Sequence, residues 1–412
     1  MTIKTAVSAA QLRAVVIAVA CMLSLLGCAS ARPWRLEAAR QQALDEVLRS
    51  AITAGDLSGV VMLVTTKDSI VYQRAFGVLD PVAGRLLAPH AVFNIASMTK
   101  PITSVAAMML VDEGKLGLDD PASRYLPELK GREVLVGIDS AKGTVATRPA
   151  SRELTIRDLL RHTSGIAYSF SNNELRAVEQ STKISDRGAP LVHDPGARWT
   201  YGMGTAQVGW IVENVSGMSL EEFFTRRIFE PLGMQETGFS MPATRASRLM
   251  TLSRRRGGQL IARPRPDSIS TAGRGDGDLI STAGDYARFM QMVLGDGARR
   301  GTRLVSTASM AELTRDQLGS LTVVEQPAAI PGLSAAFPLG AGRDGFSLGF
   351  QVAVNGQDGR PNGTLSWAGL YNTHFWIDTK TGIGVLFLTQ VLPFYDPQVM
   401  TVLRAVERAL YR

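Results

Sequence analysis

A helix that is apolar on nearly all of its faces constrains this fold more than any other feature of the sequence. It follows Pro101, and its apolar residues are Ile102, Val105, Ala106, Ala107, Met108, Met109, Leu110 and Val111. A helix of this kind has no face suited to water, so it must lie inside a large core. Pro101 is tolerated in its first turn, and Gly114 suits a left-handed cap at its end. The sequence therefore predicts a buried central helix that ends before Gly114.

A serine and a lysine, Ser97 and Lys100, stand at the head of this helix. Residues three apart share a helix face, so the Lys100 amine can reach the Ser97 hydroxyl. A serine becomes a useful nucleophile when a neighbour takes its proton, and burial can lower the pKa of a lysine enough for that task. The amide groups at the helix head also favour negative charge. The pair is a candidate nucleophile and base, and the alternative is an N-cap serine beside a solvated lysine.

The first 27 residues are typical of an export signal. Lys4 and Arg13 precede an apolar run, residues 14–26, that is too short to span a bilayer comfortably. The run ends in Leu25-Leu26-Gly27-Cys28, which resembles the lipobox of bacterial lipoproteins. The resemblance implies cleavage before Cys28, lipidation of Cys28 and a membrane-anchored protein that faces the periplasm. Simple secretion or an uncleaved anchor is the alternative.

Charge and cysteine content disfavour several classes of function. Without residues 1–27 the chain has 42 Lys and Arg against 37 Asp and Glu, a net charge of +5, and no basic helix indicates nucleic acid. Cys21 and Cys28 both lie in the signal segment, so the mature fold has no disulfide or thiolate nucleophile. The four histidines lack metal-ligand spacing. We expect no metal and no cofactor, and the sequence does not indicate an oligomeric state.

The order of predicted elements indicates a discontinuous α/β fold. A helix over about 33–54 and two strands, over about 59–65 and 69–76, precede the buried helix. Mostly helical sequence follows until strands return near residue 345, and a last helix follows Asp396 as N-cap. We therefore expect a layered α/β lobe packed on an all-helical lobe. The α/β lobe is predicted over about 33–95 and 340–412, and the helical lobe over about 96–339.

One dense basic run, Arg254–Arg256, precedes Gly257-Gly258. We predict that it lies in a solvated turn, and contact with anionic lipid headgroups is the alternative.

Two further motifs join the Ser97-x-x-Lys100 pair. They are Pro195-Gly196-Ala197-Arg198-Trp199-Thr200-Tyr201-Gly202-Met203 and Gly363-Thr364-Leu365-Ser366-Trp367-Ala368-Gly369. In this order the three motifs resemble the serine β-lactamase and penicillin-binding-protein superfamily, and most closely the family VIII carboxylesterases and related serine hydrolases of its class C-like branch. Connecting phrases at 154–165 and 278–286 extend the resemblance over nearly all of the mature chain.

The resemblance implies a fold and a set of roles. The fold would be β-lactamase/transpeptidase-like over 28–412, with an antiparallel sheet flanked by the N- and C-terminal helices. Ser97 would be the acyl-accepting nucleophile, with Lys100 as its base or proton partner. Tyr201 would share the proton and activate water for deacylation, its phenolate stabilised by Lys100. The backbone N–H groups of Ser97 and Leu370, just after Trp367-Ala368-Gly369, would form the oxyanion hole.

Two departures from the superfamily pattern bear on the substrate. Tyr201-Gly202-Met203 stands in place of Tyr-x-Asn, so the amide that grips an amide-bearing substrate is missing. Trp367-Ala368-Gly369 stands in place of Lys-Thr-Gly and replaces a cation with a flat apolar wall. Both changes favour uncharged carboxylic esters as small-molecule substrates over penicillins and D-Ala-D-Ala peptides.

Other functions stay open on the sequence alone. A β-lactamase or DD-peptidase of the same fold would act on an amide. Acyl transfer to an acceptor other than water would need the same residues. A non-catalytic lipoprotein could bind peptidoglycan fragments or a partner protein in the same cleft.

Several further residues are weighed as site candidates or decoys. Lys380-Thr381-Gly382 matches Lys-Thr-Gly but is predicted to be a hairpin turn, and Ser347 in Gly345-x-Ser-x-Gly349 is predicted to be structural because no helix follows it. His162 and His374 are predicted to be structural histidines. Candidate pocket walls, with core packing as the alternative for the first two, are Trp199, Tyr168, Trp367 and Tyr371.

Overall fold

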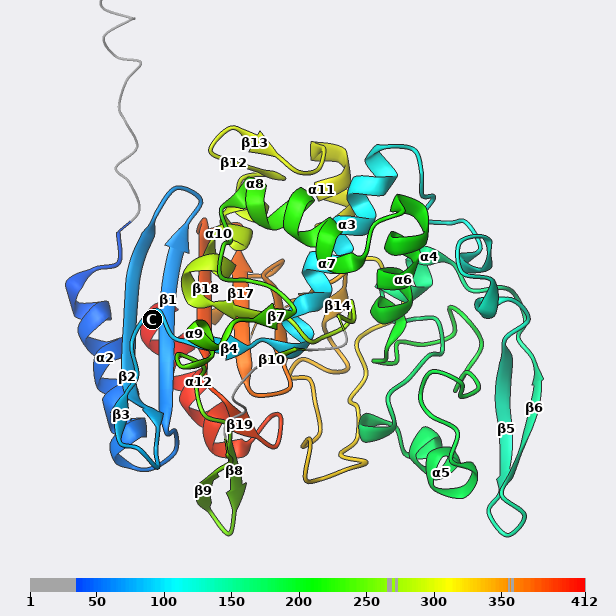
Figure 1. Cartoon of the computed structure of the whole chain (residues 1–412), viewed down its shortest axis with the longest axis horizontal. Helices are drawn as coiled ribbons and strands as arrows, with labels where there is room; N and C mark the ends of the chain where they lie inside the picture. The colour runs from blue at the N-terminus through cyan, green and yellow to red at the C-terminus, as the bar shows by residue number, and fades with distance from the viewer. Residues whose placement is uncertain (1–34, 265–268, 271–272, 355, 357–358, 412) are drawn as a thin grey trace, which may run out of the picture. The chain divides into compact units, whose positions relative to one another are not determined.

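An eight-stranded antiparallel sheet organises the fold (Figure 1). The computed structural model describes residues 35–411 apart from 265–268, 271–272, 355 and 357–358, so the predicted signal segment and Cys28 lie outside the described residues. Residues 36–412 form one compact unit.

The sheet joins strands from the two ends of this unit. Its order is β14 (Gly345–Phe346), β15 (Gln351–Val352), β16 (Leu365–Gly369), β17 (Thr373–Asp378), β18 (Ile383–Leu388), β1 (Gly59–Thr66), β2 (Ile70–Asp80) and β3 (Arg85–Leu86). Val61 of β1 pairs with Leu388 of β18, so an early and a late strand are neighbours at the centre. The strands that return near residue 345 begin with two short ones, β14 and β15, and the N–H of Phe350 bonds to Ser347 Oγ in the turn between them.

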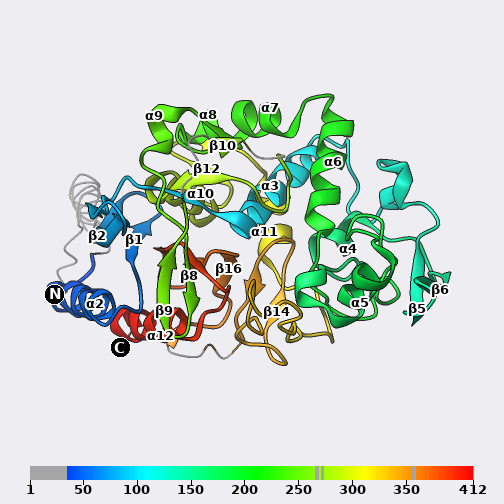
Figure 2. The same ribbon diagram turned by 60° about the horizontal axis from the view of Figure 1, so that its bottom comes forward.

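Helices lie on both faces of this sheet (Figure 2). On one face, α2 (Ala38–Thr53) packs against α12 (Pro397–Tyr411). On the other, α10 (Ala283–Leu294) packs on β1 and β18. The Asp396 carboxylate accepts the N–H of Val399 at 3.1 Å, which confirms the predicted N-cap of the last helix.

The prediction of a solvated arginine run is wrong for Arg255. Arg254–Arg256 lies in β8 (Ser253–Arg256), which pairs with β9 (Gln259–Ala262). The Nε of Arg255 lies 2.7 Å from an Asp396 carboxylate oxygen, and the two side chains are 10% and 1% exposed. Because Asp396 also caps α12, this ion pair connects the hairpin to the C-terminal helix.

The predicted central helix is confirmed. A 3₁₀ turn, η1 (Ala96–Met98), leads into α3 (Thr99–Asp112), which is buried from Thr99 to Leu110. Helices α6 (Gly204–Ser216) and α11 (Thr307–Thr314) pack on it. Other helices of the described chain are α4 (Ile156–Leu160), α5 (Asn173–Thr182), α7 (Leu220–Phe224), α8 (Glu230–Leu232), α9 (Ala243–Ala246), the π-helix η5 (Thr225–Phe229) and the 3₁₀ turns η2 (Ala122–Arg124), η3 (Pro127–Leu129) and η4 (Ser169–Ser171).

The sequence predicts an all-helical lobe around α3, but this lobe also contains strands. It also carries a hairpin of β5 (Glu133–Asp139) and β6 (Thr144–Pro149). Short strand pairs elsewhere are β4 (Val92–Asn94) with β11 (Ile280–Thr282), β7 (Ser240–Met241) with β10 (Ile269–Ser270), β12 (Ala298–Arg299) with β13 (Thr302–Arg303), and β19 (Val391–Leu392) with β8.

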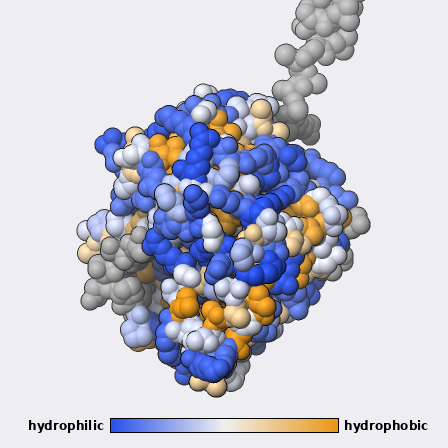
Figure 3. All heavy atoms as spheres, turned by 90° about the vertical axis from the view of Figure 1, so that its right-hand side faces the viewer, coloured by the Kyte–Doolittle hydropathy of each residue, from blue (hydrophilic) through white to orange (hydrophobic). Residues whose placement is uncertain are grey.

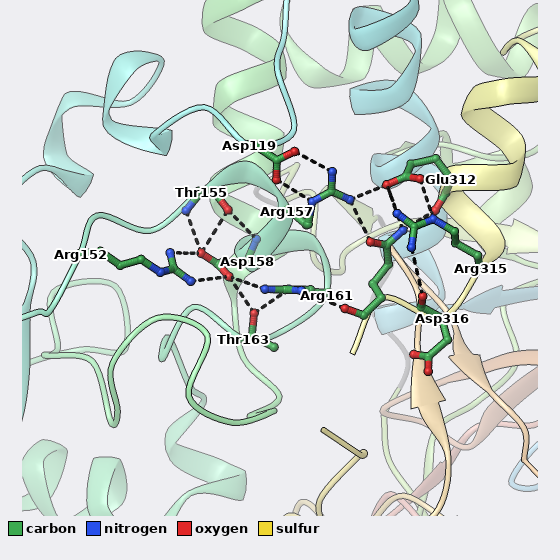
Figure 4. Close-up of polar contacts among 11 residues, drawn as sticks. Asp119, Arg152, Thr155, Arg157, Asp158, Arg161, Thr163, Glu312, Arg315 and Asp316 are labelled. Atoms are coloured by element: carbon green, nitrogen blue, oxygen red, sulfur yellow. Dashed lines mark hydrogen bonds and ion pairs between the residues drawn. The ribbon is translucent and has the colours of Figure 1, made fainter. Parts of the chain in front are cut away.

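A buried carboxylate, Asp158, holds the turn that follows α4 (Figure 4). Its oxygens accept bonds from the side chains of Arg152, Arg161 and Thr163, and it forms a capping box with Thr155. His162 lies between Arg161 and Thr163 in the sequence, and its carbonyl oxygen accepts the N–H of Thr200 at 2.8 Å. The Asp158 cluster therefore fixes the backbone on which the Tyr201 segment rests.

The face that bears β5 and β6 is largely hydrophilic, with apolar side chains scattered across it (Figure 3). In the part of the chain that the structure describes, no helix is both long and apolar enough to cross a membrane.

Candidate active site

Ser97 lies in η1, in the turn that enters α3 from the sheet. The residue before it, Ala96, has a φ of 44°, a left-handed conformation that costs free energy in a residue with a side chain. Two bonds hold this turn: Thr99 Oγ1 donates to the Ala96 carbonyl at 2.7 Å, and the N–H of Ile95 donates to the carbonyl of Leu279 at 3.0 Å. The serine therefore sits on a constrained turn.

The structure brings the three predicted catalytic side chains together. Lys100 Nζ lies 3.2 Å from Ser97 Oγ, and the Tyr201 hydroxyl lies 2.6 Å from the same oxygen. Nζ also lies 4.8 Å from the centre of the Tyr201 ring. Lys100 and Tyr201 are 1% and 2% exposed, so both proton partners of Ser97 are buried.

Two residues that the motifs did not identify complete the surroundings of Lys100. Nζ donates to the carbonyl oxygen of Asp276 at 2.7 Å and to the hydroxyl of Tyr168 at 3.1 Å. The Tyr168 hydroxyl in turn bonds to the Asp276 carboxylate. Tyr168 had been considered only as a pocket wall. Asp276 lies 176 residues from Lys100 and just before one of the recognised phrases, and no local pattern marks its contact.

Aromatic rings pack tightly around Tyr201. The ring centres of His162, Trp367, Tyr168 and Phe337 lie 4.9, 5.0, 5.3 and 5.5 Å from its own. The backbone next to Tyr201 is also tightly packed. A Cβ added to Gly202 would lie 1.9 Å from the carbonyl oxygen of Ile166. Only glycine fits there, and this explains the Tyr201-Gly202 pair of the motif.

The end of β16 meets the backbone just before the serine. A Cβ on Gly369 would lie 2.2 Å from the carbonyl oxygen of Ile95. Among the described hydrogen bonds, none gives the N–H of the next residue, Leu370, an acceptor. This placement is compatible with the predicted oxyanion hole, which stays a prediction.

A cavity of about 210 Å³ opens in front of Ser97. Its aromatic walls are Tyr168, Phe170, Tyr201, Tyr371 and Phe394, and its polar walls include Arg274, Asp276 and Asp278. Ala368 and Leu370 also line it. Two of the four candidate wall residues, Tyr168 and Tyr371, therefore face the cavity.

The two tryptophans lie behind the cavity instead. Trp367, predicted as the flat wall, packs its ring against Tyr201 and Phe346 and is 6% exposed. Trp199 is 1% exposed and lies 6.0 Å from the His162 ring and 6.4 Å from the Trp367 ring. These tryptophans support Tyr201 from behind.

Burial and neighbouring charges set the ionisation of this region. Burial and the Asp276 carboxylate raise the pKa of Tyr168 well above its usual 10, so Tyr168 stays a phenol at neutral pH. Burial and the Lys100 charge lower the pKa of His162 well below 6.5, so this imidazole stays neutral.

The histidines and decoy motifs do not reach Ser97. No described hydrogen bond joins His162 or His374 to Ser97, and burial lowers the pKa of His374 to about 3. Lys380-Thr381-Gly382 forms the turn after β17, where Asp378 accepts the N–H groups of Lys380 and Thr381. The opposite end of that strand approaches the site, where Thr373 contacts the Ile95 carbonyl.

The sequence is similar to a known protein family and to several of its individual members. The sequence matches the Beta-lactamase family over residues 44–407. Protein Rv1367c of Mycobacterium tuberculosis is 36% identical over 370 residues, which cover 84% of this chain and 89% of that protein. The lovastatin esterase of Penicillium rubens is 28% identical over 401 residues, covering 90% and 98%. Further curated relatives are named as acyltransferases and as an esterase.

A solved structure gives the same fold. A mutant of the simvastatin synthase LovD of Aspergillus terreus superposes with a TM-score of 0.78 at 26% identity, covering 91% of this chain and 98% of that one. The predicted β-lactamase/transpeptidase-like fold is confirmed.

Proposed function

Because this chain belongs to the β-lactamase family, we propose that it is a serine hydrolase that cleaves carboxylic esters through an acyl-enzyme on Ser97. One observation carries the proposal. The Tyr201 hydroxyl and Lys100 Nζ lie 2.6 and 3.2 Å from one serine oxygen, at the base of a cavity that can admit a small ester.

In this mechanism, Ser97 Oγ attacks the ester carbonyl and its proton passes to Tyr201, whose phenolate the Lys100 charge stabilises. The N–H groups of Ser97 and Leu370 stabilise the oxyanion of the tetrahedral intermediate. Tyr201 then gives the proton to the departing alkoxide, which leaves the acyl group on Ser97. Water attacks the acyl-enzyme next, losing one proton to Tyr201, and that proton returns to Ser97 Oγ as the acid leaves.

The walls of the cavity support an uncharged ester as the substrate. Met203 takes the place of the amide-bearing residue of β-lactamases, Ala368 and Leu370 line the cavity, and the arginine in its wall, Arg274, is paired with Asp276. The names of several relatives, which include esterases, favour the same class of reaction.

Acyl transfer to an alcohol is a second candidate because several relatives are named as acyltransferases. The acceptor alcohol would occupy the position of the hydrolytic water and use the same proton transfers. The two reactions differ only in the group that takes the acyl chain from Ser97.

We also propose that Cys28 is lipidated and anchors the protein to a membrane, facing the periplasm. This proposal depends on the Leu25-Leu26-Gly27-Cys28 sequence alone. Metabolic labelling with a fatty-acid analogue should mark the wild-type protein but not Cys28→Ser, and a wild-type protein that takes up no label would refute the lipid anchor.

The test uses p-nitrophenyl butyrate and nitrocefin with a form that begins after Cys28, beside Ser97→Ala and Tyr201→Phe. Ester turnover that both substitutions abolish, with little turnover of nitrocefin, is the expected result. Nitrocefin turnover or covalent labelling by penicillin would support a β-lactamase or DD-peptidase. Ligand binding that survives Ser97→Ala, with no acyl-enzyme from any activated ester, would support a binding protein. An ester assay with added alcohol separates hydrolysis from acyl transfer through the ratio of acid to new ester.

A further inference from the structure

We propose that Tyr168 and Asp276 are positioning residues that hold Lys100 as an ammonium ion and so direct its charge to Tyr201. This inference rests on the proposed acyl-enzyme chemistry at Ser97 and explains how the active protonation state is maintained.

The first step is a count of donors and acceptors around Lys100. An ammonium group carries three N–H donors and no acceptor, whereas a neutral amine carries two donors. Nζ has three oxygen partners: Ser97 Oγ at 3.2 Å, the Tyr168 hydroxyl at 3.1 Å and the Asp276 carbonyl at 2.7 Å. The side chain is 1% exposed, so the protein and not water supplies these acceptors. Three acceptors around a buried nitrogen match the ammonium form.

The second step distinguishes the two phenols beside Lys100. The Tyr168 hydroxyl donates its proton to the Asp276 carboxylate, which leaves its lone pairs for Nζ. Tyr168 is thereby an acceptor toward Lys100 and has no contact with Ser97 among the described hydrogen bonds. The Tyr201 hydroxyl, in contrast, lies 2.6 Å from Ser97 Oγ. Of the two phenols, only Tyr201 therefore lies within reach of a proton transfer with the serine.

The third step is the rigidity of Asp276. Its carboxylate is paired with Arg274 at 3.0 and 3.2 Å, and its side chain is fully buried. The surrounding loop is bonded to α3 on either side of the lysine. Thr103 Oγ1 donates to the Gly275 carbonyl at 2.5 Å, and the N–H of Leu279 donates to Thr99 Oγ1 at 3.3 Å. The loop and the helix therefore hold the acceptors of Lys100 in a fixed geometry.

One proton can lie on either Lys100 or Tyr201, and these contacts favour its position on Lys100. With the proton on Lys100, Tyr201 is the phenolate that takes the proton of Ser97 as Oγ attacks. With the proton on Tyr201, the lysine would be a neutral amine that can donate to only two of its three oxygen partners, and Ser97 would have to donate its own proton to Nζ. The charged and titratable groups facing Lys100 are Tyr168, Tyr201, Asp276 with its partner Arg274, and the neutral His162. Among them Asp276 contacts Nζ directly, through its backbone carbonyl oxygen.

The experiment uses the full chain and two readouts. One is the rate at which a fluorophosphonate probe labels Ser97 as a function of pH, which requires a reactive serine but no ester turnover. The other is kcat and KM for p-nitrophenyl butyrate. The variants are Tyr168→Phe, which removes one acceptor of Nζ, and Asp276→Asn, which removes the charge. The matched control is Tyr72→Phe, because Tyr72 is also buried and donates to a carboxylate, Asp45, at 2.7 Å, but lies outside the cavity.

We expect both site variants to lower the labelling rate and kcat by about 10- to 100-fold, with KM changed by less than about threefold. In Asp276→Asn the pH profile of the labelling rate should also change, because the bonds from Tyr168 and Arg274 that hold the acceptors of Lys100 in place are altered. Tyr72→Phe should lower the melting temperature without moving the profile.

Wild-type rates and an unshifted profile in Tyr168→Phe and Asp276→Asn would overturn the inference, as would an equal effect of Tyr72→Phe. If Asp276→Asn does not fold, Tyr168→Phe, which keeps the Asp276–Arg274 pair, decides the matter through its labelling rate. Wild-type protein that is labelled but hydrolyses no ester would refute the proposed esterase and leave the labelling comparison to decide the roles of Tyr168 and Asp276. Wild-type protein that is not labelled at Ser97 would overturn both proposals.

Discussion

Ser97 and Tyr201 are 104 residues apart in sequence, yet their side-chain oxygens lie 2.6 Å apart. This contact depends on two close backbone approaches, one behind Tyr201 at Gly202 and one beside the serine at Gly369. The geometry of the candidate site is therefore set by backbone packing as much as by the three reactive side chains.

Replacement of Tyr201 by phenylalanine should lower kcat for p-nitrophenyl butyrate by about 10²- to 10⁴-fold, because the group that carries the proton is lost. KM should change little, since the ring and its packing remain. Steady-state kinetics beside Ser97→Ala measure the effect. Tyr125→Phe is the control, because the Tyr125 hydroxyl also makes a hydrogen bond, to Asp120, but lies away from the cavity. A variant with near-wild-type kcat would remove Tyr201 from the mechanism.

Replacement of Gly202 by alanine should destabilise the fold by about 1–3 kcal/mol, because the new Cβ would overlap the Ile166 carbonyl. The displaced Tyr201 should also reduce kcat. Gly137→Ala is a matched control, since a Cβ there meets nothing within 4 Å. Thermal melting and ester kinetics of the two variants give the comparison. Equal stability of the two variants would contradict the close approach.

Replacement of Asp158 by asparagine should destabilise the protein by about 3 kcal/mol at pH 7, because Arg152 and Arg161 lose a buried partner. Burial opposes ionisation of Asp158, but the bonds from Arg152 and Thr155 outweigh it and lower its pKa. The stability gained from a lowered pKa is present above the unfolded value of about 3.9 and is lost as pH falls through the folded value. The difference in free energy of unfolding between the wild type and Asp158→Asn should therefore become smaller below about pH 4.

Urea unfolding at pH 7, 5 and 3.5 tests this pH dependence. The exposed Asp68 offers the control Asp68→Asn, which should change stability by less than about 0.5 kcal/mol. If the difference in free energy of unfolding between the wild type and Asp158→Asn stays constant from pH 7 to 3.5, the charge of Asp158 does not stabilise the fold.

Replacement of Arg255 by alanine should destabilise the protein by about 3 kcal/mol, because Asp396 would keep a buried charge without its partner. Arg256→Ala, at the exposed end of the same strand, should cost less than about 0.5 kcal/mol. Guanidinium unfolding of both variants makes the comparison. If Arg255→Ala and Arg256→Ala both lower the stability by less than about 0.5 kcal/mol, Arg255 is solvated, as the sequence predicts.

The features that the sequence predicts well are those with local causes. The apolar run after Pro101 and the Asp396 cap each follow from residues within a few positions of one another. Ser97 and Lys100 are close for the same reason, because a single helical turn joins them.

Features that depend on distant segments were missed. Nothing near Arg255 indicates a partner 141 residues away, and nothing near Tyr168 indicates the Asp276 carboxylate 108 residues away. The position of Trp367 is a subtler case, because the motif that contains it was recognised from the sequence but not the face on which its ring would lie. In each case the deciding contact exists only after sheet and lobe have packed.

The first turn of α2 and the last turn of α12 meet, where the Arg40 side chain bonds to the carbonyl of Leu410. The path of the chain from residue 38 to 411 is thus almost a closed ring. Chains whose ends meet in this way commonly tolerate circular permutation. A linker between these two helices, with a new opening at the exposed Gly257-Gly258 turn, would keep every contact around Ser97. The order in which Ser97, Tyr201 and Leu370 are synthesised is therefore separable from the geometry in which they meet.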